Sequence, residues 1–119
     1  MNWIVNFHES FETEFADFYD SVKIEIMAHV RLLQTFGPQL SRPHADTLEG
    51  SKHANMKELR FKADNGVWRI AFAFDPERSA ILLVAGDKSG MSQKLFYKQL
   101  ISRADARYTE HLQELKGDQ

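Results

Sequence analysis

Basic side chains recur in the middle of the chain, in two segments that are expected to pair as strands. Arg60 and Arg69 lie on either side of residues 63–66, whose sequence Ala-Asp-Asn-Gly is typical of a tight turn. Pairing the two segments inward from this turn sets Arg60 directly opposite Arg69. Two guanidinium groups so placed repel each other unless an anion neutralises them. The pattern therefore indicates either an Arg–Glu network that includes Glu58 or a surface that binds phosphate.

Side-chain alternation assigns the residues of three expected strands, 57–62, 67–74 and 80–86, to two faces of a sheet. One face is apolar and is expected to pack against helices: Leu59, Phe61, Trp68, Ile70, Phe72, Phe74, Ile81, Leu83 and Ala85. The other face carries Glu58, Arg60, Lys62, Arg69, Ala71, Ala73, Leu82, Val84, Gly86 and Lys88. This second face is either a solvated surface or a basic floor on which small alanines leave room for a ligand.

The charges are unevenly distributed along the chain. The sequence has 15 Lys and Arg against 17 Asp and Glu, which gives a net charge of −2. Residues 1–50 hold 3 basic and 8 acidic side chains, residues 51–103 hold 10 and 5, and residues 104–119 hold 2 and 4. The middle segment, rather than the whole surface, is therefore the part expected to attract anions.

Length and composition exclude several classes of protein. The 119 residues, 43% of them hydrophobic, are expected to form a single domain over residues 1–119. The absence of cysteine excludes disulfide scaffolds, thiol catalysis and cysteine-based zinc sites. The five histidines show no close pair at metal-ligand spacing, and no phosphate-loop motif occurs, so no metal is expected. Without a signal peptide or a long apolar stretch, the chain is expected to be cytoplasmic and to have no membrane partner.

Hydrophobic spacing predicts the N-terminal elements. Residues 3–7 alternate as in a short strand. A helical pattern then runs from Phe11 to Leu33, with Ser10 as the expected cap. Asp20-Ser21 can divide this pattern into two helices, and Gly37-Pro38 ends it.

The rest of the chain completes an α+β fold. A loop is expected from Pro43 to about Ala54, before the three strands. From about Ser92 helical spacing returns, or a second helix starts at Ser102; the apolar stripe is Phe96, Leu100, Ala104, Tyr108, Leu112 and Leu115. The predicted order is an N-terminal strand, one or two helices, an antiparallel sheet of three further strands and a C-terminal helix.

Several short motifs follow one another in a characteristic order. They are Gly50-Ser51-Lys52, Met56-Lys57-Glu58-Leu59-Arg60, Trp68-Arg69-Ile70-Ala71-Phe72, Gly86-Asp87-Lys88-Ser89-Gly90, Phe96-Tyr97 and Arg103-Ala104-Asp105-Ala106-Arg107-Tyr108. As an ordered set they resemble HigB-like toxins of the RelE/ParE superfamily, over roughly residues 3–115. The resemblance implies a RelE-like fold, with helices packed on one face of a twisted, mainly antiparallel sheet.

The resemblance also implies an activity. HigB-like proteins are toxins of type II toxin–antitoxin systems, and their usual activity is cleavage of messenger RNA on the translating ribosome, with no metal or other cofactor. Such cleavage needs a proton acceptor, positive groups around the phosphorane and a donor for the leaving 5′-oxygen. The matching catalytic positions are Arg60, Arg69 and Lys88, and His53 is added as a base that titrates near neutral pH. The expected substrate-binding residues are Lys52, Lys57, Lys62 and Tyr97.

The implied partners are a cognate HigA-like helix-turn-helix antitoxin, in a hetero-oligomer with the toxin, and the ribosome with its messenger RNA. The chain departs from the RelE branch after Gly86, because a helix follows in place of a basic tail that contains Tyr or His. Two alternatives therefore stay open. The chain is a ParE-like toxin that inhibits gyrase, or a catalytically inactive phage- or plasmid-derived relative that only binds its partner.

Overall fold

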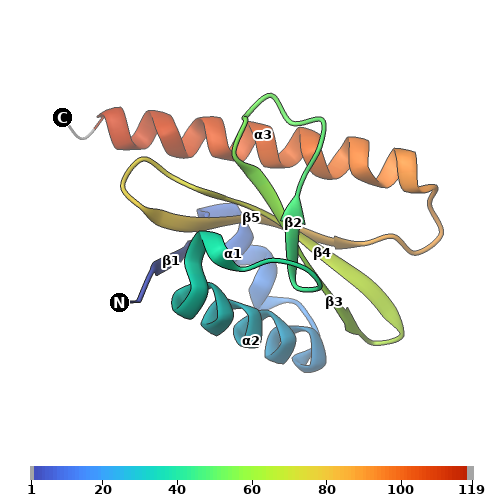
Figure 1. Ribbon diagram of the computed structural model, residues 1–119. Helices are drawn as coiled ribbons and strands as arrows, with labels where there is room; N and C mark the ends of the chain where they lie inside the picture. Colours follow the sequence, from blue (N-terminus) through green and yellow to red (C-terminus); the bar gives the residue numbers. More distant parts are fainter. Residues whose placement is uncertain (1, 118–119) are drawn as a thin grey trace.

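A five-stranded sheet separates the helices into two layers in the computed structural model, which describes residues 2–117. The strands are β1 (Ile4–Phe7), β2 (Ala45–Thr47), β3 (Met56–Ala63), β4 (Gly66–Phe74) and β5 (Ser79–Asp87), in the spatial order β1-β5-β4-β3-β2. β1 is parallel to β5, and every other pair is antiparallel. Helices α1 (Glu9–Ala16) and α2 (Asp20–Phe36) cover one face, and α3 (Gln93–Gly117) covers the other (Figure 1). The α+β class is confirmed.

The second face of the sheet has a hydrophobic core of its own. The side chains of Phe96, Leu100, Ala104 and Tyr108, spaced one helical turn apart on α3, pack on this face. Beneath them lie Met56, Ala71, Ala73, Ile81, Leu83 and Val84. The expectation of helices on one face only is therefore wrong. The two alanines are fully buried, and the room that they leave is taken by the helix instead of a ligand.

The β3–β4 hairpin has the predicted register, with Arg60 opposite Arg69. The β4–β5 pair differs because a bulge leaves Leu83 without a partner, between residues paired to Ala71 and Phe72. One extra residue exchanges the faces of the residues before it. Ile81 and Leu83 therefore face α3, whereas Leu82 faces α1 and α2, the reverse of the prediction.

The N-terminal elements correct one further expectation. α1 begins at Glu9, and its cap is His8, whose Nδ1 accepts a hydrogen bond of 3.1 Å from the Ser10 backbone N–H. Ser10 is therefore not the cap. The His8 backbone N–H still donates to Leu82 of β5, so the strand runs straight into the helix and the cap lies two residues earlier than predicted. The division of the helical pattern into α1 and α2 is confirmed.

The end of α2 and the C-terminal helix are as predicted, whereas the strand β2 is not predicted from the sequence. α2 ends at Gly37, whose φ of +54° suits glycine, as predicted. β2 lies inside the predicted loop and is only 3 residues long, too short to show an alternating pattern. α3 is one continuous helix with no break at Ser102. No helix within residues 2–117 combines the length and the hydropathy that a membrane crossing requires.

Candidate functional site

A buried polar network lies between the sheet and the N-terminal half of α3. Arg69 donates from Nε to the Tyr97 hydroxyl at 2.7 Å, and this hydroxyl donates to Glu58 Oε1 at 2.8 Å. The Arg69 guanidinium also lies 5.5 Å from the ring centre of Phe96 and 5.4 Å from that of Tyr97. Arg69 is only 7% exposed. The expectation that it faces solvent is wrong, because α3 covers it and supplies its partners.

Glu58 lies between the two arginines that the hairpin register sets side by side. Its Oε1 is 3.9 Å from Nε of Arg60 and 3.9 Å from Nε of Arg69. The side chain of Arg60 is 46% exposed, whereas those of Arg69 and Glu58 are buried. The predicted Arg–Glu network therefore exists, but one carboxylate faces two guanidinium groups. Asp46 of β2, the pairing partner of Glu58, has its own ion pair with Arg42, so positive charge stays in excess at the hairpin.

The environment changes how easily Glu58 and Tyr97 ionise. Burial raises the pKa of Glu58 above its ordinary value, against the opposing effects of the Tyr97 hydrogen bond and the two arginines. Burial also raises the pKa of Tyr97, and the hydrogen bond to Glu58 adds to this effect. Tyr97 is therefore a phenol that stays protonated near neutral pH, and Glu58 is a carboxyl group with an enhanced affinity for a proton.

A groove of about 530 Å³ opens beside Arg69. Its lining residues are Val67, Arg69, Lys88, Ser89, Gly90 and Met91. The segment from Lys88 to Met91 turns between β5 and α3, with a φ of +73° at Gly90 and a backbone hydrogen bond from Met91 to Lys88. This turn brings Lys88 into the same groove as Arg69. A smaller groove of about 200 Å³ is lined by Glu58 and Tyr97, together with Thr47, Leu48, Glu49 and Gln93.

His53 lies in a different part of the molecule. Its Nε2 is 3.1 Å from the hydroxyl oxygen of Thr109, which follows Tyr97 by twelve residues, about 18 Å along a helix. The backbone N–H of Lys52 donates to Asp105, also on α3, at 3.1 Å. The structure therefore does not bring the loop that holds Lys52 and His53 together with the Arg69 groove.

The other predicted lysines lie on different sides of the sheet. Lys62 is exposed beside the hairpin turn and, by alternation, shares a face with Arg60. Lys57 lies on the opposite face, with α1 and α2. Of the predicted residues, the structure brings together Arg60, Arg69, Lys88 and Tyr97, with Lys62 next to them.

The sequence predicts Glu58 only as a group that neutralises the two arginines. The sequence does contain a signal for the central position of Glu58. Glu58 lies two residues before Arg60, and the hairpin register brings it close to Arg69. The contribution of Tyr97 follows from the packing of α3 on this face. Within residues 2–117, no three side chains of His, Asp or Glu are grouped in a way that could hold a metal ion.

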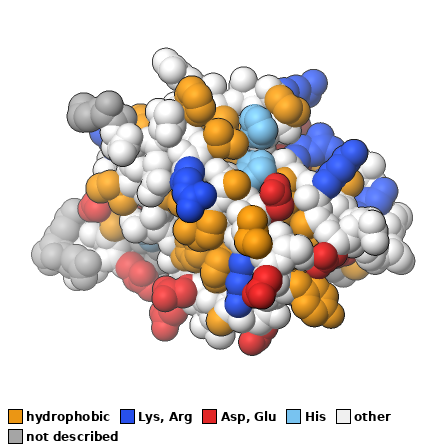
Figure 2. All heavy atoms as spheres, turned by 90° about the horizontal axis from the view of Figure 1, so that it is seen from below, with side chains coloured by type: hydrophobic (Ala, Val, Ile, Leu, Met, Phe, Trp, Pro, Cys, Tyr) orange, Lys and Arg blue, Asp and Glu red, His pale blue; other side chains and the backbone are white. Residues whose placement is uncertain are grey.

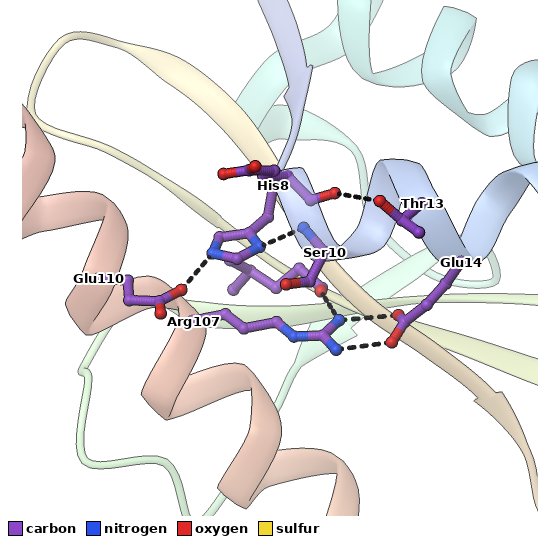
Figure 3. Close-up of polar contacts among 8 residues, drawn as sticks. His8, Ser10, Thr13, Glu14, Arg107 and Glu110 are labelled. Carbon is purple, nitrogen blue, oxygen red and sulfur yellow. Dashed lines mark hydrogen bonds and ion pairs between the residues drawn. The ribbon is translucent and has the colours of Figure 1, made fainter.

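A second polar cluster joins α1 to the C-terminal half of α3 (Figure 3). Arg107 donates from Nη1 and Nη2 to the two carboxylate oxygens of Glu14, at 2.8 and 2.7 Å, and from Nη1 to the Leu83 carbonyl at 2.7 Å. His8 Nε2 lies 2.7 Å from Glu110 Oε1. The hydrogen bond from Arg107 lowers the pKa of Glu14. Each basic group here has its own carboxylate, so this cluster stabilises the packing of α3 against the N-terminal elements.

Comparisons with known proteins agree with this architecture. Residues 13–109 match the family described as phage derived protein Gp49-like (DUF891). HigB2 of Mycobacterium tuberculosis (strain ATCC 25618 / H37Rv), named as a candidate toxin, is 42% identical over 92 residues, which cover 76% of this chain and 45% of HigB2. HigB3 of the same strain, also named as a candidate toxin, is 49% identical over 78 residues, 66% of each protein. The chain thus spans about half to two thirds of these relatives.

The fold is similar to a solved structure as well. A mutant of the E. coli toxin RelE in the free state superposes with a TM-score of 0.57 and 12% identity, covering 86% of this chain and 96% of RelE. At this identity the likeness concerns the fold alone. The family match spans most of the chain, and the relatives and the fold agree with it. The chain therefore belongs to the Gp49-like family, is HigB-like in sequence and has a RelE-like fold.

Proposed function

We propose that this protein is the toxin of a type II toxin–antitoxin system and that it cleaves messenger RNA on the translating ribosome. One observation carries the proposal: Arg69 and Lys88 share a groove, and Arg69 is hydrogen-bonded to the Tyr97 hydroxyl, which in turn donates to Glu58. Cations suit a phosphate, and a phenol–carboxyl pair suits proton transfer. The names of HigB2 and HigB3 support the assignment as a toxin.

The proposed chemistry uses the ribose 2′-oxygen as the nucleophile. Arg69 and Lys88 bind the scissile phosphate and stabilise the negative charge that grows as the phosphorane forms. The 2′-hydroxyl proton passes to the Tyr97 oxygen while the Tyr97 proton moves to Glu58. The Lys88 ammonium gives a proton to the leaving 5′-oxygen, so the products are a 2′,3′-cyclic phosphate and a 5′-hydroxyl. Arg60, which is half exposed beside Glu58, attracts the neighbouring phosphate.

The proposal includes the partners that the resemblance implies. A HigA-like helix-turn-helix antitoxin holds the toxin inactive in a hetero-oligomer, and the ribosome presents the messenger RNA, which places the activity in the cytoplasm. The exposed basic groups near the hairpin, Arg60 and Lys62, suit an acidic antitoxin segment as well as RNA.

Expression of the chain from a tightly controlled promoter tests the function. Growth, primer extension on abundant messages and plasmid supercoiling are followed together, with and without the antitoxin. We expect growth arrest and cleaved messages, both abolished by R69A and unaffected by R31A, which removes an exposed arginine on α2. Altered supercoiling without cleavage identifies a ParE-like gyrase inhibitor. Antitoxin binding with neither effect identifies an inactive relative.

A further inference from the structure

A third groove, of about 520 Å³, lies at the edge of the sheet. Its walls are formed by Glu25, His29, Pro43, His44, Arg60, Phe61, Lys62 and Val67. β2 pairs only with residues 57–59 of β3, so the second half of β3 forms the edge. Figure 2 looks onto the side of the molecule that holds α2 and shows histidine side chains among hydrophobic ones, with Lys and Arg side chains to their right. The groove is thus largely apolar, with basic groups at its rim.

His29 gives this groove an unused hydrogen-bond acceptor. Its Nδ1 lies 2.8 Å from the carbonyl oxygen of Glu25 and must donate to it, because a carbonyl only accepts. In the neutral ring Nε2 then carries a lone pair, and this buried atom has no partner among residues 2–117. A buried acceptor without a donor is unfavourable, so an N–H group that reaches it gains a hydrogen bond that the free protein lacks.

Aromatic rings surround this acceptor. The ring of His44 stands edge-on to that of His29, with centroids 5.4 Å apart, and the ring of Phe61 lies 5.1 Å away on another side. His29 and Phe61 are buried, whereas His44 is only partly so. A flat ligand therefore reaches Nε2 of His29 when the His44 ring turns aside. The turned His44 ring then stacks on the ligand. These surroundings suit a planar aromatic group that carries an N–H donor.

The groove is continuous with the site proposed for cleavage. Val67, which is 38% exposed, lines both this groove and the groove that holds Arg69 and Lys88. Arg60 is likewise shared, because it lines this groove and faces Glu58 of the buried network. A polyanionic strand that leaves Arg69 across the hairpin thus meets further cations on its way to the histidines.

We propose that this groove binds the base of a nucleotide next to the cleaved phosphate. The base stacks on His44, its exocyclic amino group donates to His29 Nε2, and the flanking phosphate is bound by Arg60 and Lys62. The inference rests on the proposed function, since it takes single-stranded RNA as the substrate. RNA is favoured over a protein segment because Val67 borders both this groove and the phosphate-binding groove, and because Arg60 and Lys62 line the aromatic pocket.

Binding of RNA that cannot be cleaved tests this inference separately from catalysis. The probe is a short single strand of 2′-O-methyl nucleotides, which lacks the nucleophile, made with adenine or with an abasic residue next to the central phosphate. Fluorescence anisotropy on the full chain is expected to show about tenfold tighter binding of the adenine strand. H29F, which keeps an aromatic ring but removes the acceptor, is expected to abolish this preference and to leave binding of the abasic strand unchanged.

Two further variants keep the test valid if H29F does not fold. H44A changes a rim residue and is expected to reduce the same preference, whereas R31A, at an exposed residue of α2 that does not line the groove, is the control. Equal binding of the adenine and abasic strands by the unaltered protein overturns the inference. Weaker binding of the antitoxin by H44A, with RNA binding unchanged, overturns it in favour of a protein-docking groove. Base preference in a chain that cleaves no message on translating ribosomes refutes the proposed function alone.

Discussion

The two halves of α3 hold charged clusters that differ in how their charges are matched. Near Tyr97, one carboxylate faces Arg60 and Arg69 at 3.9 Å each, and the direct hydrogen bonds run through a phenol. Near Arg107, a bidentate pair with Glu14 closes at 2.7 to 2.8 Å. We refer to these as the hairpin cluster and the clamp. The hairpin cluster has spare positive charge beside a groove, whereas the clamp has none.

This difference in charge matching suggests that the hairpin cluster serves phosphate binding, whereas the clamp serves the stability of the fold. A cation whose carboxylate is shared can still gain energy from a phosphate, because its charge is only partly neutralised. A cation in a short bidentate pair would lose two strong hydrogen bonds to its carboxylate if it bound a phosphate instead, so the exchange is unfavourable. We therefore expect substitutions in the hairpin cluster to change activity most, and substitutions in the clamp to change the free energy of unfolding.

The largest expected effect is that of R69A in the hairpin cluster. Loss of one preorganised donor at a developing charge lowers a rate by about 10²–10³-fold, and we expect message cleavage to fall by this factor. R69K is expected to restore it only partly, because lysine lacks the planar fork of donors. Since Arg69 is buried, circular dichroism must show that each variant is folded. K88A, at a partly exposed residue, is expected to give a similar loss with no change in stability.

Full cleavage activity in both folded alanine variants contradicts the assignment of the groove. R31A, on the opposite side of the sheet from α3, is the matched control for the loss of a single positive charge.

In the clamp, R107A is expected to lower the free energy of unfolding by about 1–3 kcal/mol, because it removes charge-assisted hydrogen bonds to Glu14 and to a backbone carbonyl. Cleavage per folded molecule is expected to stay unchanged. Urea denaturation measures the first quantity and an RNA cleavage assay the second. R103A, at an exposed position one turn earlier on α3, is expected to change stability by less than about 0.5 kcal/mol. A loss of activity in R107A without a loss of stability contradicts the distinction between the two clusters.

Much of this fold could be predicted because its signals are local. The turn at residues 63–66 and the alternation on either side of it are enough to set Arg60 opposite Arg69, as the structure confirms. The apolar stripe of α3 was equally clear, but nothing in the stripe says which face of the sheet it covers. That choice buries Ala71 and Ala73 and converts an expected open floor into a core.

The remaining differences come from tertiary contacts that leave no periodic signal. A single unpaired residue, Leu83, exchanges the faces of half a strand. The residue type of His53 suggests a general base, yet its hydrogen bond to Thr109 holds it about 18 Å along α3 from Tyr97. The arrangement of Tyr97 between Arg69 and Glu58 exists only because α3 crosses the hairpin at that turn. The residue types in the sequence are enough to single out Arg60 and Arg69. The packing of α3 determines that Arg69 is buried and hydrogen-bonded to Tyr97, whereas Arg60 stays exposed.

Y97F sharpens the comparison inside the hairpin cluster. The ring that packs against Arg69 is kept, while the hydroxyl that joins Arg69 to Glu58 is lost. We expect the free energy of unfolding to fall by about 1–3 kcal/mol, because two hydrogen bonds are lost and the buried Arg69 and Glu58 each lose a partner. If Tyr97 passes the proton to Glu58, cleavage falls by more than binding of uncleavable RNA does. Y108F removes the hydroxyl of the buried tyrosine farther along α3 and is expected to leave cleavage unchanged.

The smallest expected effect is a contrast in how stability depends on pH. The hydrogen bond from Arg107 lowers the folded-state pKa of Glu14, so the folded clamp binds fewer protons than the unfolded chain does. Its stabilising contribution is therefore present above the ordinary value of 4.5 and is lost as the pH falls through the lowered pKa. Burial raises the folded-state pKa of Glu58, so its contribution has the opposite sign. That contribution is present below 4.5 and is lost as the pH rises through the raised value.

Urea denaturation between acidic and neutral pH measures this contrast in two variants. E14Q is expected to flatten the rise of the free energy of unfolding with pH below 4.5, and only modestly, because the Glu14 side chain is 37% exposed and screened by solvent. E58Q removes a contribution that weakens with pH above 4.5, so its stability relative to the unaltered protein increases toward neutral pH. A change of the same sign in both variants contradicts the contrast. Opposite changes show that the clamp is stabilised by its ionised carboxylate, whereas the hairpin cluster retains a carboxyl group that folding holds closer to its protonated form.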